Sequence, residues 1–118
     1  MISMAILRPL RPVRVDMSAL SDAGKMQTRL TDPINVATAL SELGIGLLRS
    51  YRDSPTDARK NIIEASFSQS ARLLMGVARS KEYPKRTKTQ ALISAVEQGF
   101  NADEAQIRFI REAASQKP

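Results

Sequence analysis

The sequence predicts an all-α protein, a small bundle of three to four antiparallel helices with an extended Arg/Pro-rich N-terminal arm. Two observations favour this class. Apolar residues recur at spacings of three and four, which is typical of amphipathic helices. No run of alternating β-branched residues lies between turn residues, so a sheet is not indicated. The 118 residues leave room for one domain. We expect the basic arm over residues 1–30 and the helical bundle over residues 31–118.

The arm is predicted to be extended over Arg8–Val15, because Pro9 and Pro12 cannot lie inside a helix. A polyproline II segment has three residues per turn, so one edge of it carries Arg8, Arg11 and Arg14. A second edge carries Leu10 and Val13. The alternative is a disordered terminus. Residues 17–30 could form a short helix.

The first strong helix is predicted to begin at Asp32 and Pro33. Asp32 is a good N-cap, and proline suits the first helical position. Its predicted buried stripe consists of Val36, Leu40, Leu43, Leu47 and Tyr51, widened by Ile45 and Leu48. Gly44 and Gly46 each cost about 1 kcal/mol relative to alanine inside a helix. They indicate either a close helix crossing or kink, or two tolerated weak spots.

A second helix is predicted over about 55–80, with Ser54 as its cap and Pro55 in its first turn. One face of this helix is apolar or small at helical spacing. The stripe that we expect to be buried consists of Ile63, Phe67, Ser70, Leu74 and Val77.

A third helix is predicted over about 87–98, with Gly99 as its C-terminal stop. Its candidate core residues are Leu92, Ile93, Ala95 and Val96. Asn101 then caps a fourth helix, and Asp103 and Glu104 occupy the first turn, where the helix dipole favours acids. The fourth helix is expected to bury Ile107, Ile110 and Ala114. The alternative is that the third and fourth helices are one bent helix.

The composition argues against catalysis. The chain has no cysteine and no histidine, which excludes Ser-His-Asp and Cys-His arrangements and zinc sites built from imidazole or thiolate. The usual phosphate-binding and nucleophile motifs are missing. The one candidate carboxylate pair, Asp103 and Glu104, is explained by helix capping. We therefore expect no enzymatic activity, no cofactor and no metal site.

The hydropathy of the chain indicates a soluble protein. No stretch approaches the ~20 apolar residues of a transmembrane helix. Residues 1–7 are apolar but lack the basic leader and the cleavage site of a secretory signal. We expect a cytoplasmic protein, or one within a virus-like or other intracellular assembly, without a membrane partner.

The main functional signal is the charge of residues 79–88, where five Lys or Arg residues face the single acid Glu82. A helix dipole favours cations near a helix C-terminus, which accounts for Arg79 and Lys81. It does not account for Lys85, Arg86 and Lys88. A segment of this charge density suits contacts with phosphates. Contact with an acidic protein surface and a merely solvated loop are the alternatives. Tyr83 could stack on a base, or pack under its own helix.

These features predict a non-enzymatic basic protein that binds DNA or RNA through backbone phosphates, with weak sequence specificity, as an accessory or assembly subunit. We expect a homo-oligomer, with a larger protein as a further possible partner. The candidate nucleic-acid-binding residues are Arg8, Arg11, Arg14, Arg79, Lys81, Lys85, Arg86 and Lys88. The alternative is a self-assembling structural subunit of a coat, filament or particle, whose arm wraps a neighbouring subunit.

From Leu40 to Ala114 the layout resembles the Avd-like four-helix-bundle family, the accessory proteins of diversity-generating retroelements. The matching features are a helix ending in Leu48-Arg49-Ser50-Tyr51, a short Pro-containing hinge, a long second helix, and a Leu/Ile helix after Tyr83-Pro84. The resemblance implies a bundle that associates into a ring and binds a reverse transcriptase and RNA. The residues that it implies to face nucleic acid are Arg79, Lys81, Lys85, Arg86, Arg108 and Arg111.

Overall fold

A computed structural model describes residues 7–16 and 32–116. This part of the chain contains three α-helices and no strand, which confirms the all-α class. The helices are α2 (Pro33–Arg49), α3 (Asp57–Arg79) and α4 (Lys85–Ser115), and a 3-10 turn covers Tyr51–Asp53. The short helix considered over residues 17–30 lies outside the described residues. Of the predicted arm, only residues 7–16 are described, and they contain no helix.

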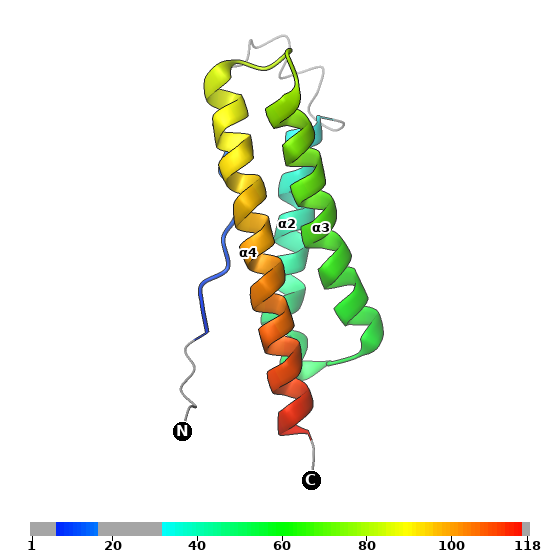
Figure 1. The fold of residues 1–118 in the computed structure, drawn as a ribbon. Coiled ribbons are helices and arrows are strands. Elements are labelled where there is room, and N and C mark those ends of the chain that lie inside the picture. Colours follow the sequence, from blue (N-terminus) through cyan, green and yellow to red (C-terminus); the bar gives the residue numbers. More distant parts are fainter. Residues whose placement is uncertain (1–6, 17–31, 117–118) are drawn as a thin grey trace.

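α3 packs against both other helices, whereas α2 and α4 have little contact with each other. Consecutive helices run in opposite directions, and residues 7–16 extend along α4 (Figure 1). The extents of 57 × 26 × 19 Å describe an elongated molecule. Such a thin body leaves a long strip of each helix facing outward.

The predicted start of α2 is confirmed. The Asp32 Oδ1 atom accepts a hydrogen bond of 2.7 Å from the Ile34 amide, and Pro33 is the first helical residue. The buried stripe differs from the predicted one, because Leu43 is 47% exposed. The helix instead buries a face that contains several small residues: Ile34, Ala37, Ser41, Gly44, Ile45 and Leu48. Small residues allow α2 to approach α3 closely.

The two glycines of α2 have different roles. A Cβ atom on Gly44 would lie 2.9–3.1 Å from ring atoms of Phe67, which is fully buried and cannot move aside. A Cβ atom on Gly46 would meet nothing within 4 Å. Gly44 therefore serves a close helix crossing, and Gly46 is a tolerated weak spot.

The predicted stripe of α3 is confirmed, since Ile63, Phe67, Ser70, Leu74 and Val77 are all buried. The predicted cap is wrong. Thr56 caps the helix, and its Oγ1 atom accepts a hydrogen bond of 3.1 Å from the Arg59 amide. Ser54 lies two residues earlier, because the 3-10 turn at Tyr51–Asp53 and Pro55 delay the start of the helix.

The predicted break at Gly99 is wrong, because α4 continues from Lys85 to Ser115. Gly99 has no positive φ, the backbone conformation that a glycine stop requires, so it remains an ordinary helical residue. Asn101 is consequently a buried interior residue and not a cap. Asp103 and Glu104 likewise lie far from any helix start, so the capping explanation for them is also wrong.

The predicted buried face of α4 is confirmed at Ala95 and is wrong at the other positions. Five of its large apolar residues are 44–69% exposed: Leu92, Ile93, Val96, Ile107 and Ile110. Ala114 is exposed as well. The buried face consists mainly of small and polar residues, namely Thr87, Ala91, Ser94, Ala95, Gln98, Asn101, Glu104, Ala105 and Phe109. Hydropathy alone does not determine which side of this helix faces inward.

We predict opposite effects on stability for alanine at the two glycines. Gly46→Ala should raise the free energy of unfolding by about 1 kcal/mol, because alanine is the better helix former. Gly44→Ala should lower it by about 1 kcal/mol, because overpacking against Phe67 (~1–3 kcal/mol) exceeds the gain in helix propensity. Urea denaturation of both variants measures the difference. Equal stability of the two variants would contradict the close crossing at Gly44.

Candidate nucleic-acid interface

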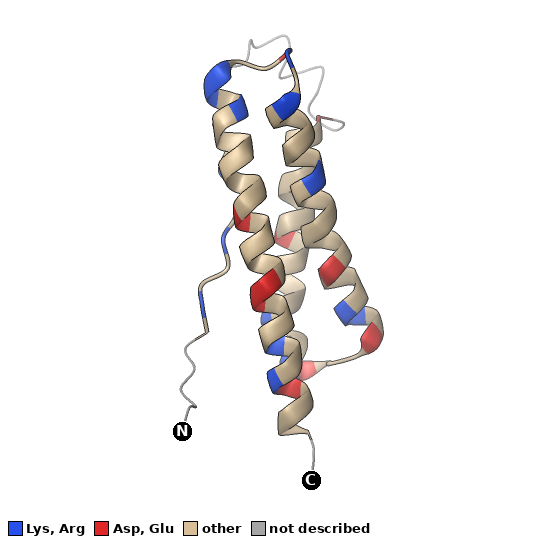
Figure 2. Cartoon of the chain, viewed as in Figure 1, with Lys and Arg blue, Asp and Glu red and all other residues tan. Residues whose placement is uncertain are grey.

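Five of the predicted site residues gather at one end of the molecule, which we call the basic end: Arg79, Lys81, Lys85, Arg86 and Lys88. Arg79 is the last residue of α3, Lys81 lies in the connecting loop, and the other three belong to the start of α4. Figure 2 shows Lys and Arg residues together where α3 ends and α4 begins. Lys88 is half-buried and the other four are exposed.

The charge of the basic end is largely uncompensated. The Arg86 Nη2 atom lies 3.7 Å from the Asp16 Oδ2 atom, and both side chains are well exposed, at 72% and 41%. Such a surface pair contributes little to stability. Among the described residues, no carboxylate lies within ion-pair distance of the other four cations. The first turn of α4 contains no acid and no side-chain cap, so its backbone N–H groups add to the positive potential.

Tyr83 is half-buried at the basic end. Its side chain packs against the cluster that contains Ile34, Leu74 and Val77, and its hydroxyl donates a hydrogen bond of 3.3 Å to the Asp32 Oδ2 atom. Burial raises the pKa of Tyr83, and the charge of Asp32 raises it further. Asp32 thereby caps α2 and also fixes the loop between α3 and α4. The arrangement agrees with Tyr83 packing under its own helix and gives no support to base stacking.

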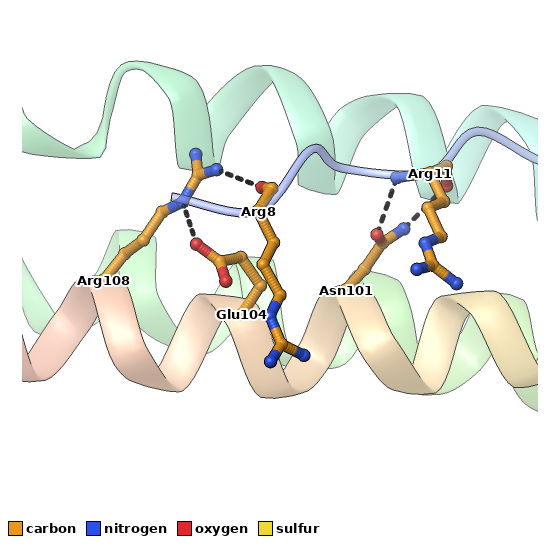
Figure 3. A network of polar contacts seen from close by, with 5 residues as sticks. All are labelled: Arg8, Arg11, Asn101, Glu104 and Arg108. Carbon is orange, nitrogen blue, oxygen red and sulfur yellow. Dashed lines mark hydrogen bonds and ion pairs between the residues drawn. The ribbon is translucent and has the colours of Figure 1, made fainter. Parts of the chain in front are cut away.

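The three arginines of residues 7–16 are bound to α4 through their backbone. The Arg11 amide donates to the Asn101 Oδ1 atom at 2.8 Å, and the Arg11 carbonyl accepts from Asn101 Nδ2 at 2.7 Å. The Arg8 carbonyl accepts from Arg108 Nη2 at 3.0 Å (Figure 3). The Arg14 amide donates to the Ser94 Oγ atom at 3.0 Å. Backbone binding leaves all three arginine side chains exposed.

The register of these bonds follows from two matching repeats. The arginines are three residues apart, and their partners Ser94, Asn101 and Arg108 are seven residues apart. Three residues of polyproline II advance about 9.3 Å, and seven residues of an α-helix advance about 10.5 Å. In this register Leu10 is buried and Val13 packs against the core. Both residues were predicted to lie on one apolar edge of the extended segment.

A buried polar network connects this segment to two helices. The Ser41 hydroxyl of α2 donates to the Gln98 Oε1 atom at 2.7 Å, and Asn101 Nδ2 donates to the same oxygen at 2.9 Å. Gln98 Nε2 donates in turn to the Arg11 carbonyl at 3.2 Å. Sequence reasoning missed Gln98 and Ser41, because isolated polar residues on a helix are normally solvated.

Arg8, Arg11 and Arg14 do not join the basic end. They form a row along α4, and Ser94, the partner of Arg14, lies eight residues after Arg86, about 12 Å along the helix axis. The structure therefore gathers five of the eight predicted site residues at one end. The other three form a row along α4, whose last member, Arg14, lies two residues before Asp16, the ion-pair partner of Arg86.

Sequence reasoning gave Arg49 and Arg52 no part in a site. Together with Arg108 and Arg111 they line a cavity of about 430 Å³ at the opposite end of the molecule. Arg108 is already bonded to Glu104, with 3.0 Å between its Nε atom and the Glu104 Oε2 atom, and Glu112 also lines the cavity. Figure 2 shows Asp and Glu residues among the basic residues at this end. Positive charge is thus better compensated here than at the basic end.

The described residues contain no group of three potential metal ligands. None of the described helices is long and apolar enough to cross a membrane. Comparisons with models of protein families, with curated proteins and with solved structures found no match. The resemblance to the retroelement accessory proteins therefore stays a prediction.

We predict that Asn101→Ala lowers the free energy of unfolding by about 2 kcal/mol, because it leaves the Arg11 amide without a partner and leaves the Arg11 carbonyl with only the bond from Gln98. Hydrogen exchange at the Arg11 and Arg14 amides should accelerate as well. Gln90→Ala is the matched control, because it removes one exposed bond, to the Asp16 amide. The network has no positioning role if the two variants are equally stable.

We also predict a loss of stability in alkali through Tyr83. The folded protein favours the neutral phenol, so the unfolded chain loses its proton first, near the ordinary pKa of about 10. Stability is therefore unaffected by this group below about pH 10 and falls above it. At neutral pH the free energy of unfolding of Tyr83→Phe should be about 1 kcal/mol lower than that of the wild type. Between about pH 9 and about pH 11, however, it should fall by less than that of the wild type.

Denaturation at several pH values measures this effect. Burial raises the pKa of Tyr51 as well, with Asp57, Glu112 and Glu64 adding to the shift, so that tyrosine contributes a similar decline in both proteins. Parallel pH profiles of the wild type and Tyr83→Phe would show that the phenol of Tyr83 titrates as it does in water.

Proposed function

We propose that this protein binds nucleic acid through backbone phosphates at the basic end, without catalysis and with weak sequence specificity. The observation that carries the proposal is the gathering of five cations at one end, where one exposed ion pair is their only described neutralisation. A surface of this kind gains free energy by releasing the counterions that surround a polyanion.

Phosphates fit the basic end better than bases do. Lys and Arg provide charge without the fixed donor and acceptor pattern that base recognition requires. The tyrosine of the loop is held by Asp32, so the basic end offers no described aromatic side chain for stacking. The same contacts serve duplex DNA and RNA, which agrees with weak specificity.

The proposal includes a finer view of the architecture, in which α2, α3 and α4 form one antiparallel bundle and residues 7–16 are an arm fixed to α4. The hydrogen bonds of Arg8, Arg11 and Arg14 to α4 support this view. An arm that wraps a neighbouring subunit would first have to give up these bonds. The arginine row then serves as a secondary cationic surface along the bundle.

We predict that affinity for a 20-base-pair duplex falls linearly on a plot of log affinity against log salt, with a slope of about −0.9 per neutralised phosphate. The triple variant Lys85→Ala, Arg86→Ala, Lys88→Ala should bind more weakly. Its slope should be less negative by up to about 2.7, corresponding to three lost contacts. Fluorescence anisotropy over a series of salt concentrations measures both quantities.

A second triple variant controls for net charge. Arg49→Ala, Arg52→Ala, Arg72→Ala removes three exposed cations that lie outside the basic end. It should leave the slope nearly unchanged. Equal loss of affinity in both triple variants would mean that binding depends on overall charge, and an unchanged slope in the first would exclude the basic end as the site.

A further inference from the structure

The outer face of α4 carries a continuous apolar strip, which we call the seam: Ile93, Val96, Phe100, Ile107 and Ile110, flanked by Leu92. These six side chains are 44–69% exposed. Isolated apolar residues are common on protein surfaces. A row of six on one helix is not, especially since the same helix turns several polar residues inward. A contiguous exposed apolar surface of this kind is characteristic of an interaction site.

The spacing of the seam identifies what kind of surface covers it. Positions 93, 96, 100, 103, 107 and 110 alternate steps of three and four, which is the heptad pattern of a helix that packs along another helix. The seam is about 25 Å long at 1.5 Å per residue. Asp103 is its one charged position, and a single polar residue in such a seam fixes register and orientation.

The size of the seam matches an interface between two copies. Six large side chains of roughly 200 Å² each, about half exposed, present on the order of 600 Å² of apolar surface. This is the upper end of the ~300–600 Å² that the largest patch of a typical monomer reaches. Two such surfaces together bury ~1,200 Å², the lower end of stable interfaces.

The seam is complementary to itself in the antiparallel direction. Pairing about a point between Asn101 and Ala102 places Ile93 opposite Ile110 and Val96 opposite Ile107 of the second copy. Phe100 then lies beside Asp103 of the second copy. Parallel pairing in register would instead place the two Asp103 carboxylates together, and like charges at an interface are strongly unfavourable.

Arginine side chains from residues 7–16 complete this complementarity. The guanidinium of Arg11 lies 4.7 Å from the centre of the Phe100 ring. A groove of about 320 Å³ beside the seam is lined by Arg8, Pro9, Arg11, Phe100, Asp103, Glu104 and Ile107. Figure 3 shows the Arg8 and Arg11 side chains extending in the same direction, toward α4. The guanidinium of Arg11 is therefore next to the place where antiparallel pairing brings the second Asp103.

We propose that the seam binds a second copy of this chain, forming an antiparallel α4–α4 dimer in which Arg11 of each copy meets Asp103 of the other. Among the described residues, neither side chain has an ion-pair partner within its own chain. This dimer uses a different face from the basic end, so it does not depend on nucleic-acid binding.

Sedimentation equilibrium of the full chain without nucleic acid tests the dimer. The wild type should have twice the monomer mass at micromolar concentration. Val96→Glu with Ile107→Glu should raise the dissociation constant at least about 100-fold, because burial of unpaired carboxylates is unfavourable. Leu43→Glu is the control, because Leu43 is an equally exposed apolar residue of α2. It should leave the mass unchanged.

A charge exchange tests the partner and the orientation. Arg11→Glu alone and Asp103→Arg alone should each weaken the dimer about tenfold or more, because each places like charges together. The double variant, Arg11→Glu with Asp103→Arg, places opposite charges together again. It should therefore recover at least half of the lost log affinity. Circular dichroism confirms that each variant remains helical, as expected for exposed positions. A monomeric wild type, or a dimer that survives the two seam glutamates, overturns the proposal. Failure of the double variant to recover overturns the antiparallel register.

Discussion

The polar face of α4 is the constraint on which the outward face of that helix depends, because it hydrogen-bonds both the backbone of residues 7–16 and Ser41 of α2. Asn101 binds both the amide and the carbonyl of Arg11, and Gln98 connects that carbonyl to Ser41 of α2. Buried backbone groups left without partners each cost about 1–3 kcal/mol. The polar face of α4 therefore has to face inward wherever this segment lies on it.

This constraint has a direct consequence for the opposite face. Once Ser94, Gln98 and Asn101 point inward, the isoleucines, the valine and Phe100 of α4 must point outward. Packing of α3 does not change this, because α3 meets the small residues on the inner side. The surface that results is apolar along the outer face of α4. It is basic where α3 and α4 join, as Figure 2 shows. The proposed dimer uses the apolar surface, and the proposed nucleic-acid binding uses the basic end.

Asp32 illustrates how one side chain connects local and distant structure. It caps α2 through the Ile34 amide and accepts a hydrogen bond from Tyr83, 51 residues later. The loop between α3 and α4, at the basic end, is thereby tied to the start of α2. Its cations consequently project from a fixed support, which lowers the entropy that ordering the loop on a ligand would cost.

Features that depend on a few neighbouring residues could be predicted from the amino-acid sequence. These are the all-α class, the start of α2 at Asp32 and Pro33, the buried stripe of α3 and the charge density of residues 79–88. Three features emerged from the fold alone: α4 continues through Gly99, Asn101 binds the backbone of Arg11, and the apolar side of α4 faces outward. The physical reason is distance along the chain. Arg11 and Asn101 are 90 residues apart. No local sequence pattern shows that the polar face of α4 forms hydrogen bonds with the backbone of so distant a segment.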